Sequence, residues 1–148
     1  TKKLNGESNL VYSLHGDGEL DEGQIWEAVM FAAHHKVDNL IITIDYNHKQ
    51  IDGDTEDVIS LGNLRAKLES FGWNVIEMNG NEMDEVVTTL KNARTLTGKG
   101  QCIAILMHSV MGSGVDFMEG SHKWHGVAPN DEQLANALAQ LEATLGDY

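Results

Sequence analysis

A short glycine-flanked acidic motif stands near the start of the chain, at Gly16-Asp17-Gly18. It follows an apolar segment and precedes a helical pattern, so that backbone N–H groups and a helix dipole are available to an anion. The glycines let a phosphate approach the backbone without a Cβ in the way. Asp17 would repel a bare phosphate, and a divalent cation between the two resolves this conflict. Taken alone, however, the tripeptide is more often a tight turn with a solvated aspartate.

Asn47 gives the motif a partner. It lies thirty residues after Asp17, directly after the next predicted strand. If the two strands are neighbours, they lie about 4.8 Å apart and the loops at their carboxyl ends meet. Asp17 and Asn47 would then offer two hard oxygen ligands to one ion, and Mg²⁺ is typically held by one or two such side chains plus waters and phosphate oxygens. The pair predicts a magnesium site that a diphosphate-bearing ligand completes.

These residues need a scaffold in which strands and helices alternate. Apolar runs predict strands at 9–14, 40–45, 73–78 and 101–107, and helical periodicity predicts helices at 23–35, 61–71 and around 86–93. The glycine-rich stretch 108–126 predicts no regular element. A last helix is expected to begin after Asn130, with Gln133 completing its cap. Its apolar stripe would consist of Leu134, Leu138, Leu141 and Leu145.

Alternation of this kind implies parallel pairing with right-handed crossovers. The predicted fold class is therefore α/β, a mostly parallel sheet with helices on both faces, forming one domain over residues 1–148. Ligands of such sheets bind beyond the carboxyl ends of the strands. This rule selects the loops 16–21, 46–54 and 108–126, and the turn signal Asp52-Gly53 lies in the second of them.

Composition limits the classes of function. The chain carries a net charge of −13, which disfavours an electrostatic nucleic-acid binder. Its apolar runs are too short to span a bilayer, and no signal peptide opens it, so we expect no membrane insertion. The single cysteine, Cys102, lies in an apolar run and suits a buried, inert thiol in a reducing cytoplasm.

Three longer motifs give the sequence a family resemblance. Gly16-Asp17-Gly18 followed by Asn47 resembles the thiamine diphosphate fingerprint, and the wider context is similar to transketolases. The motifs are GDGELDEGQIWEA at 16–28, NHKQIDG at 47–53 and SHKWHGVAP at 121–129. The α-ketoacid dehydrogenases and deoxyxylulose-phosphate synthase share only the GDG…N part in this form. The resemblance covers nearly the whole chain and implies a thiamine diphosphate-binding fold.

The resemblance also implies ligands for the cofactor. Asp17 and Asn47 would bind Mg²⁺, or Ca²⁺ in its place, through their side chains, and the backbone carbonyl of Lys49 would be a third protein ligand. Gly16 would leave room for the diphosphate, and Gly18 would donate its backbone N–H to it.

Three further positions gain roles in the same way. Ile51 would pack on the thiamine rings, and His125 would lie near the diphosphate and the bound sugar, polarising or protonating an oxygen during transfer. Glu22 would sit at a dimer interface, although alone it is more often a charge at a helix N-terminus. His122 and His125 are spaced like a metal pair, but a zinc site is not favoured because the loop is not helical and no cysteine assists.

The implied function is the pyrophosphate-binding half of a transketolase, which moves a two-carbon ketol unit from a ketose phosphate to an aldose phosphate. A pyrimidine-binding domain has no counterpart in this sequence. We therefore expect a partner domain or partner chain, assembly into a homodimer or heterotetramer, and no activity from this chain alone. His108 stands where the family commonly has a lysine.

Two other functions stay open at this point. One is a component of another thiamine diphosphate enzyme, of the α-ketoacid dehydrogenase or deoxyxylulose-phosphate synthase type. The other is a non-catalytic orphan domain that binds a partner. A Rossmann dinucleotide site is weaker, because Gly16, Gly18 and Gly23 do not form G-x-G-x-x-G.

Overall fold

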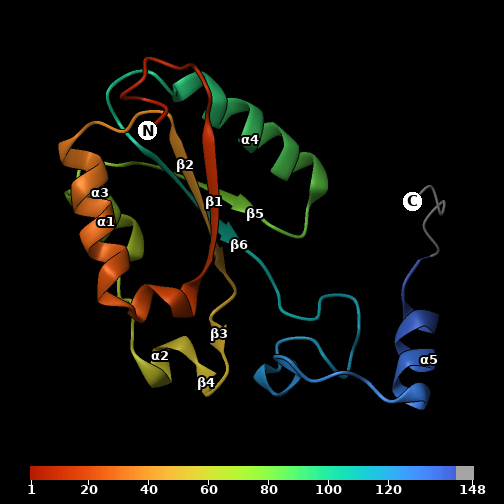
Figure 1. The fold of residues 1–148 in the computed structure, drawn as a ribbon. Coiled ribbons are helices and arrows are strands. Elements are labelled where there is room, and N and C mark those ends of the chain that lie inside the picture. Colours follow the sequence, from red (N-terminus) through yellow and green to blue (C-terminus); the bar gives the residue numbers. More distant parts are fainter. Residues whose placement is uncertain (143–148) are drawn as a thin grey trace.

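The computed structural model describes residues 1–142, and their main body is a parallel four-stranded sheet between helices (Figure 1). The strands run in the order β1-β2-β6-β5, and each neighbouring pair is parallel. Their bounds are Val11–Gly16 for β1, Leu40–Tyr46 for β2, Asn74–Asn79 for β5 and Ile103–His108 for β6. The predicted α/β class with a mostly parallel sheet is confirmed.

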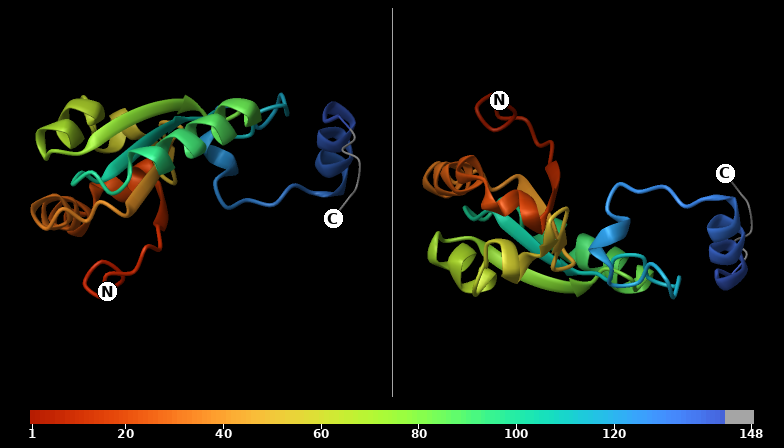
Figure 2. Two further views of the ribbon diagram at one scale, coloured as in Figure 1. Left: turned by 90° about the horizontal axis from the view of Figure 1, so that it is seen from above. Right: turned by 90° about the horizontal axis from the view of Figure 1, so that it is seen from below.

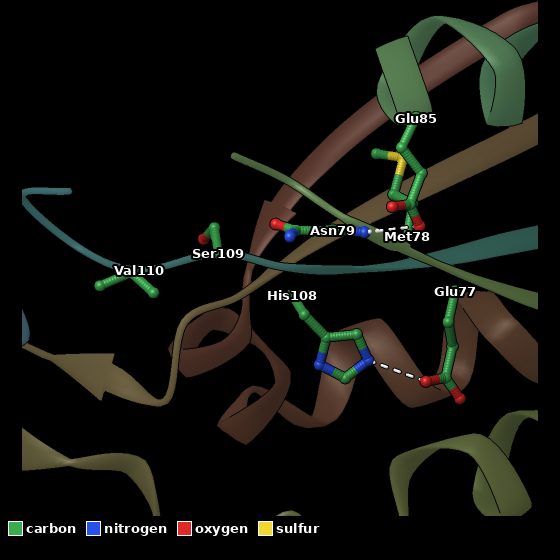
Figure 3. A pocket seen from close by; sticks show the side chains of 7 residues that line it. All are labelled: Glu77, Met78, Asn79, Glu85, His108, Ser109 and Val110. Carbon is green, nitrogen blue, oxygen red and sulfur yellow. Dashed lines mark hydrogen bonds and ion pairs between the residues drawn. The ribbon is translucent and has the colours of Figure 1, made fainter. Parts of the chain in front are cut away.

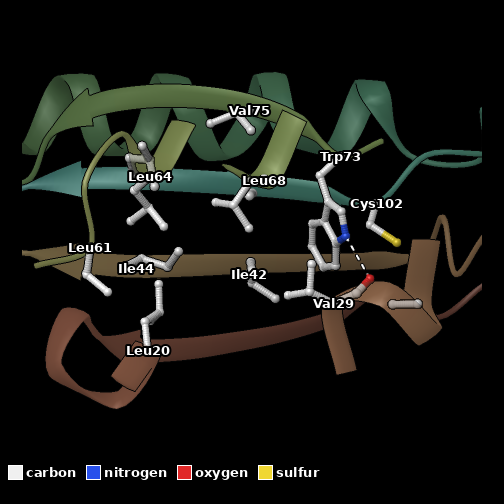
Figure 4. Close-up of a cluster of buried hydrophobic side chains, with 13 residues drawn as sticks. Leu20, Val29, Ile42, Ile44, Leu61, Leu64, Leu68, Trp73, Val75 and Cys102 are labelled. Carbon is white, nitrogen blue, oxygen red and sulfur yellow. Dashed lines mark hydrogen bonds between the residues drawn. The ribbon is translucent and has the colours of Figure 1, made fainter. Parts of the chain in front are cut away.

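Helices cover both faces of this sheet, as expected. Helices α1 (Gly23–His34) and α3 (Leu64–Ser70) lie on one face, and α4 (Met83–Leu96) lies on the other (Figure 2). The buried hydrophobic residues form two clusters, one on each face of the sheet. Strand β2 contributes to both, because successive side chains of a strand point to opposite faces. Ile42 and Ile44 pack with α1 and α3, as Figure 4 shows, and Ile41 packs with α4.

Strand and helix boundaries differ from the prediction by up to three residues, as at both ends of α4 and at the start of α3. Strand β1, expected at 9–14, is displaced by two residues at both ends, because pairing starts only at Val11, opposite Leu40. As a result β1 ends at Gly16, and Asp17 follows the strand directly. In α3, the Asn63 side chain accepts a hydrogen bond from the Ala66 N–H at 2.9 Å and so starts the helix after Leu61.

Short elements occupy segments that were predicted to be loops. The 3₁₀ helix η1 (Asp17–Asp21) follows β1, and α1 begins at Gly23, as predicted. Strands β3 (Lys49–Gln50) and β4 (Gly53–Asp54) form a small antiparallel hairpin, which confirms the turn signal at Asp52-Gly53. Helix α2 (Thr55–Val58) follows it, and the 3₁₀ helix η2 (His122–Trp124) lies in the glycine-rich stretch.

The last helix, α5 (Asp131–Gln140), projects away from the sheet (Figures 1 and 2). Its predicted cap is confirmed, because Asn130 and Gln133 exchange two hydrogen bonds of 2.9 Å between side chain and backbone. The predicted apolar stripe is not part of the core, since Leu134 and Leu138 are exposed. Leu141 follows the end of the helix and is also exposed, and Leu145 lies outside the described residues.

Strand β1 is an edge strand with one hydrogen-bonded neighbour in the part of the sheet that is described. Tyr12 and Leu14 point to the same face of the sheet as Ile41, which packs with α4. Because α4 does not extend over β1, these two side chains are 51% and 69% exposed. The strand that precedes Asp17 is therefore held by β2 on one side and is sparsely packed on one face.

Two expectations that follow from composition can be compared with the structure. Cys102 is buried, as predicted, and burial raises the pKa of its thiol to about 11, which favours an inert cysteine. None of the helices within residues 1–142 combines the length and the apolar character that a membrane span requires.

Candidate functional site

The residues selected from the sequence share one cavity at the carboxyl ends of β1 and β2. Its volume is about 410 Å³. The lining residues are Gly16, Asp17, Gly18, Glu19, Glu22, Asp45, Asn47, Lys49, Gln50, Ile51, Asp52 and His125. Every predicted site residue is in this set, although the set comes from three segments far apart in the sequence. The structure thus brings the predicted site together, while the role of each residue stays a prediction.

Adjacent strands place Asp17 beside the loop of Asn47. Strands β1 and β2 are parallel neighbours, with Gly16 opposite Asp45, so Asp17 and the residues after β2 emerge at the same edge. The backbone N–H of His48 donates to Asp17 Oδ2 at 2.6 Å. This bond ties the two loops together, and it confirms the neighbouring strands on which the predicted magnesium site depends.

The Asp17 carboxylate is buried without a compensating positive charge. Its side chain is 1% exposed, and none of the ion pairs found in residues 1–142 includes it. Burial raises the pKa of Asp17, while hydrogen bonds from the His48 and Gly18 N–H groups act in the opposite direction. An unpaired buried charge is costly, typically by several kcal/mol. A bound cation would remove this cost.

Thr55 adds a second buried polar group next to Asp17. The residue is 1% exposed, and its hydroxyl lies close enough to Asp17 to act to lower the pKa of the carboxyl group. Its Oγ1 nevertheless makes no hydrogen bond of full geometry within the described residues. A buried hydroxyl without a well-formed hydrogen bond, beside a buried carboxylate, leaves hydrogen-bonding capacity that a bound ion or water would satisfy.

The side chain of Asn47 is held at both ends. Its Oδ1 accepts a hydrogen bond from the Lys49 N–H at 2.8 Å, and its Nδ2 donates to Asp45 Oδ2 at 3.1 Å. An amide oxygen has two lone pairs, so Oδ1 retains one for a cation. Asp17 and Asn47 are therefore suited to a hard divalent ion such as Mg²⁺.

Gly18 is needed for close packing between the glycine motif and the hairpin. A Cβ at this position would lie 3.0 Å from Gln50 Cβ, nearer than carbon atoms normally approach. Gln50 also donates through Nε2 to Asp21 at 3.3 Å. Gln50 was not predicted from the sequence, because nothing in a polar loop shows which side chain meets the glycine. Asp45 was missed too, although an acid two residues before Asn47 was a usable signal.

The other predicted residues surround this centre. Glu22 is exposed and precedes α1 as its N-cap residue, and Ile51 is 72% exposed at the tip of the β3–β4 turn. His125 is exposed and follows η2. Within residues 1–142, no group of three His, Cys, Asp or Glu side chains is arranged to hold a metal.

His108 lies outside the cavity. It lines a different hollow of about 430 Å³ at the ends of β5 and β6, where its ring nitrogen is 2.8 Å from Glu77 (Figure 3). Arg65 also contacts Glu77, at 2.6 Å, and these two partners lower the pKa of the carboxyl group, with Arg65 the stronger. The departure from the usual lysine therefore leaves the Asp17–Asn47 centre intact.

Comparison with known proteins agrees with this geometry. Residues 3–145 match the family described as "Transketolase, thiamine diphosphate binding domain". The chain belongs to this family. Its relatives include an apulose-4-phosphate transketolase subunit of Phocaeicola vulgatus, which is 41% identical over 88% of the chain and 46% of that protein. Another is the 6-deoxy-6-sulfo-D-fructose transketolase subunit SqwG of a Clostridium species, 41% identical over 90% of the chain and 48% of that protein.

Solved structures of transketolases have the same fold. The enzyme of Campylobacter jejuni matches with a TM-score of 0.78 and 32% identity, over 89% of this chain and 20% of that one. The enzyme of Leishmania mexicana matches with a TM-score of 0.80 and 29% identity, over 88% of this chain and 19% of that one. The chain thus spans about half the length of the two transketolase subunits and a fifth of these whole transketolases. The resemblance derived from the motifs, and with it the thiamine diphosphate-binding fold, is confirmed.

Proposed function

We propose that this chain forms the pyrophosphate-binding part of a two-subunit transketolase, which transfers a two-carbon ketol unit from a ketose phosphate to an aldose phosphate. One observation carries the proposal. The buried and unpaired carboxylate of Asp17 shares a cavity with the fixed amide of Asn47, at the edge of the sheet where α/β proteins bind ligands. Membership of the transketolase thiamine diphosphate-binding family supports thiamine diphosphate as the ligand of this centre.

The cofactor would be thiamine diphosphate with Mg²⁺, or with Ca²⁺ in its place. Asp17 and Asn47 would bind the ion with side-chain oxygens, and Lys49 would add its backbone carbonyl. Gly18 would donate its N–H to the diphosphate, and Gly16 would leave room for it. When bound, thiamine diphosphate supplies the nucleophilic carbon and the electron sink for ketol transfer. No side chain of this chain then has to act as a nucleophile.

The remaining residues would serve the substrate and the partner. Imidazole is the side chain suited to proton transfer near neutral pH, so His125 would donate or accept a proton at a sugar oxygen. Ile51, exposed at the mouth of the cavity, would cover the thiamine rings. Glu22, also exposed at this mouth, would face a second chain.

A partner chain is part of the proposal. Relatives at 41% identity are named as subunits of transketolases, which supports a second chain carrying the pyrimidine-binding domain. The assembly would be a heterotetramer, or a dimer if both parts are joined. One buried thiol and no second cysteine suit a reducing compartment, and we place the enzyme in the cytoplasm.

A reconstitution assay tests the function. The chain is mixed with its pyrimidine-domain partner, Mg²⁺ and thiamine diphosphate, and ketol transfer is measured from xylulose 5-phosphate to ribose 5-phosphate. We expect turnover from the mixture and none from either component alone. Turnover with pyruvate or 2-oxoglutarate in place of the sugar phosphates would indicate the other class of thiamine enzyme. Cofactor binding without any turnover would favour a non-catalytic domain.

A further inference from the structure

Asp45 occupies a position in the site that no ligand assignment explains. It is the residue before the last of β2, and it lines the same cavity as Asp17 and Asn47. Its carboxylate accepts one hydrogen bond from Asn47 Nδ2, at 3.1 Å, and a second from the Ser109 hydroxyl. Both contacts are partly buried, so water competes weakly for them.

Asn47 needs such a contact because its side chain has two chemically different ends. The amide oxygen can bind a hard cation, whereas the NH₂ group has only protons to present. Rotation about the last side-chain torsion exchanges the two ends, and this torsion is soft and nearly two-fold. An asparagine ligand is therefore effective only if its surroundings distinguish nitrogen from oxygen.

The surroundings of Asn47 make this distinction twice. An ionised carboxylate can only accept hydrogen bonds, so Asp45 selects the NH₂ end. A backbone N–H can only donate, so Lys49 selects the oxygen, at 2.8 Å. The contact with Asp45 is also the charged one, and hydrogen bonds to charged groups are about twice as strong as neutral ones.

Ser109 keeps the carboxylate of Asp45 in place from the neighbouring strand. Strands β2 and β6 are paired up to Tyr46 and His108, and Ser109 follows directly after β6. The chain of contacts therefore runs from the end of β6 through Asp45 to the predicted metal ligand. Asn47 itself lies in the loop after β2, but its side chain is held by Asp45, which belongs to a central strand of the sheet.

We propose that Asp45 is a positioning residue, which holds the Asn47 amide with Oδ1 available to the divalent cation of the cofactor. The inference rests on the proposed function, because Asn47 must be the ligand for its orientation to matter. Partners that orient metal ligands typically contribute 10- to 100-fold to metal affinity. We therefore expect Asp45→Ala to weaken Mg²⁺ binding at least tenfold while Asn47 itself is unchanged.

A double-mutant cycle separates positioning from other roles of Asp45. In the variant Asn47→Asp, residue 47 presents an oxygen whichever way it turns, so it needs no orienting partner. Asp45→Ala should therefore weaken Mg²⁺ binding at least tenfold beside Asn47, and less than about threefold beside Asp at position 47. An equal loss in both backgrounds would show that Asp45 ligates the metal or supports the fold, and would overturn the inference.

The cycle is measured by calorimetric titration of Mg²⁺ at saturating thiamine diphosphate, on the chain assembled with its partner. Ser109→Ala should give a smaller loss in the same direction, because Asp45 then keeps one of its two partners. Glu132→Gln, in the first turn of α5, removes an equal charge on a helix that projects away from the sheet and should leave the affinity unchanged. A loss from Glu132→Gln equal to that from Asp45→Ala would show that the effect is one of net charge and would overturn the inference.

A metal-free measurement keeps this inference distinct from the proposed function. Without metal, Asp45→Ala should lower the Tm by about 2–4 °C more beside Asn47 than beside Asp at position 47, where it relieves a repulsion between carboxylates. A wild type that binds neither Mg²⁺ nor thiamine diphosphate would refute the proposed function. The difference in Tm would then show whether Asp45 orients the Asn47 side chain. Equal losses of Tm on Asp45→Ala in the wild type and in Asn47→Asp would overturn this inference.

Discussion

Replacing Gly18 by alanine tests how the glycine motif and the β3–β4 hairpin are packed together. The new Cβ would lie 3.0 Å from Gln50 Cβ and 3.3 Å from Gln50 Oε1, whereas carbon atoms in contact normally lie about 3.5–4.0 Å apart. The side-chain oxygen can rotate away, but the Cβ of Gln50 moves only with its backbone. The hairpin must therefore shift by about 0.5 Å or more to reach an ordinary contact distance.

The cost follows from this displacement. Overpacking of a packed site typically costs about 1–3 kcal/mol, and in a domain of this size each kcal/mol lowers the Tm by about 2–4 °C. We expect Gly18→Ala to lower the Tm of the metal-free protein by at least about 2 °C. Because the hairpin carries Lys49, the affinity for Mg²⁺ and thiamine diphosphate should also fall about tenfold, or about 1.4 kcal/mol.

Gly16 provides a matched control within the same motif. A Cβ there meets no atom within 4 Å, and its φ of −75° is accessible to any residue. Thermal unfolding should therefore show the Tm of Gly16→Ala unchanged or raised by about 1–4 °C, since alanine restricts the unfolded chain and so stabilises the protein by up to about 1 kcal/mol. Gln50→Gly should raise the Tm of Gly18→Ala relative to its effect on the wild type, because it removes the side chain that the new Cβ meets. Equal Tm values for the two alanine variants, or no restoration, would refute the packing argument.

Three further predictions concern the chemistry of the chain. Asp17→Ala should lower the affinity for thiamine diphosphate and Mg²⁺ at least tenfold, about 1.4 kcal/mol, in calorimetry of the assembled enzyme; an unchanged affinity would contradict the metal assignment. His125→Ala should reduce kcat by about 10²-fold or more with a much smaller effect on cofactor binding, and a kcat within about twofold of the wild type would make His125 a loop-packing residue. Because its pKa is raised to about 11, the Cys102 thiol should stay unreactive towards a thiol reagent at pH 8 until the protein unfolds; rapid labelling of the native protein would contradict its burial.

The centre of the site could be predicted from sequence because it depends on strand order. The run LIITID at 40–45 indicates a buried strand, and the motif around Asp17 follows the preceding one. Consecutive parallel strands are commonly neighbours, so the loops of Asp17 and Asn47 were expected to meet, and they do. Local residue types and one rule of topology were sufficient for this step.

The contacts that refine the site could not be predicted in this way. Gln50 meets Gly18, and Ser109 meets Asp45, through pairs that are 32 and 64 residues apart in sequence. Such contacts depend on strand register and on the hairpin, and neither is encoded in local periodicity. The predicted start of β1 was wrong for a related reason. Leu10 continues the apolar run, but the ladder with β2 begins only at Val11.

The position of β1 at the edge of the sheet gives the two predicted ligands different mechanical supports. Among the described residues, Asp17 follows a strand with one neighbour, whereas Asn47 follows β2, which is paired on both sides. Local opening should begin at β1, so its amide hydrogens should exchange with solvent faster than those of β2 and β6. An ion held by both residues would act as a clip between the outermost strand and the interior of the sheet. Loading the site should therefore slow exchange along the whole of β1, including amides that never touch the ligand.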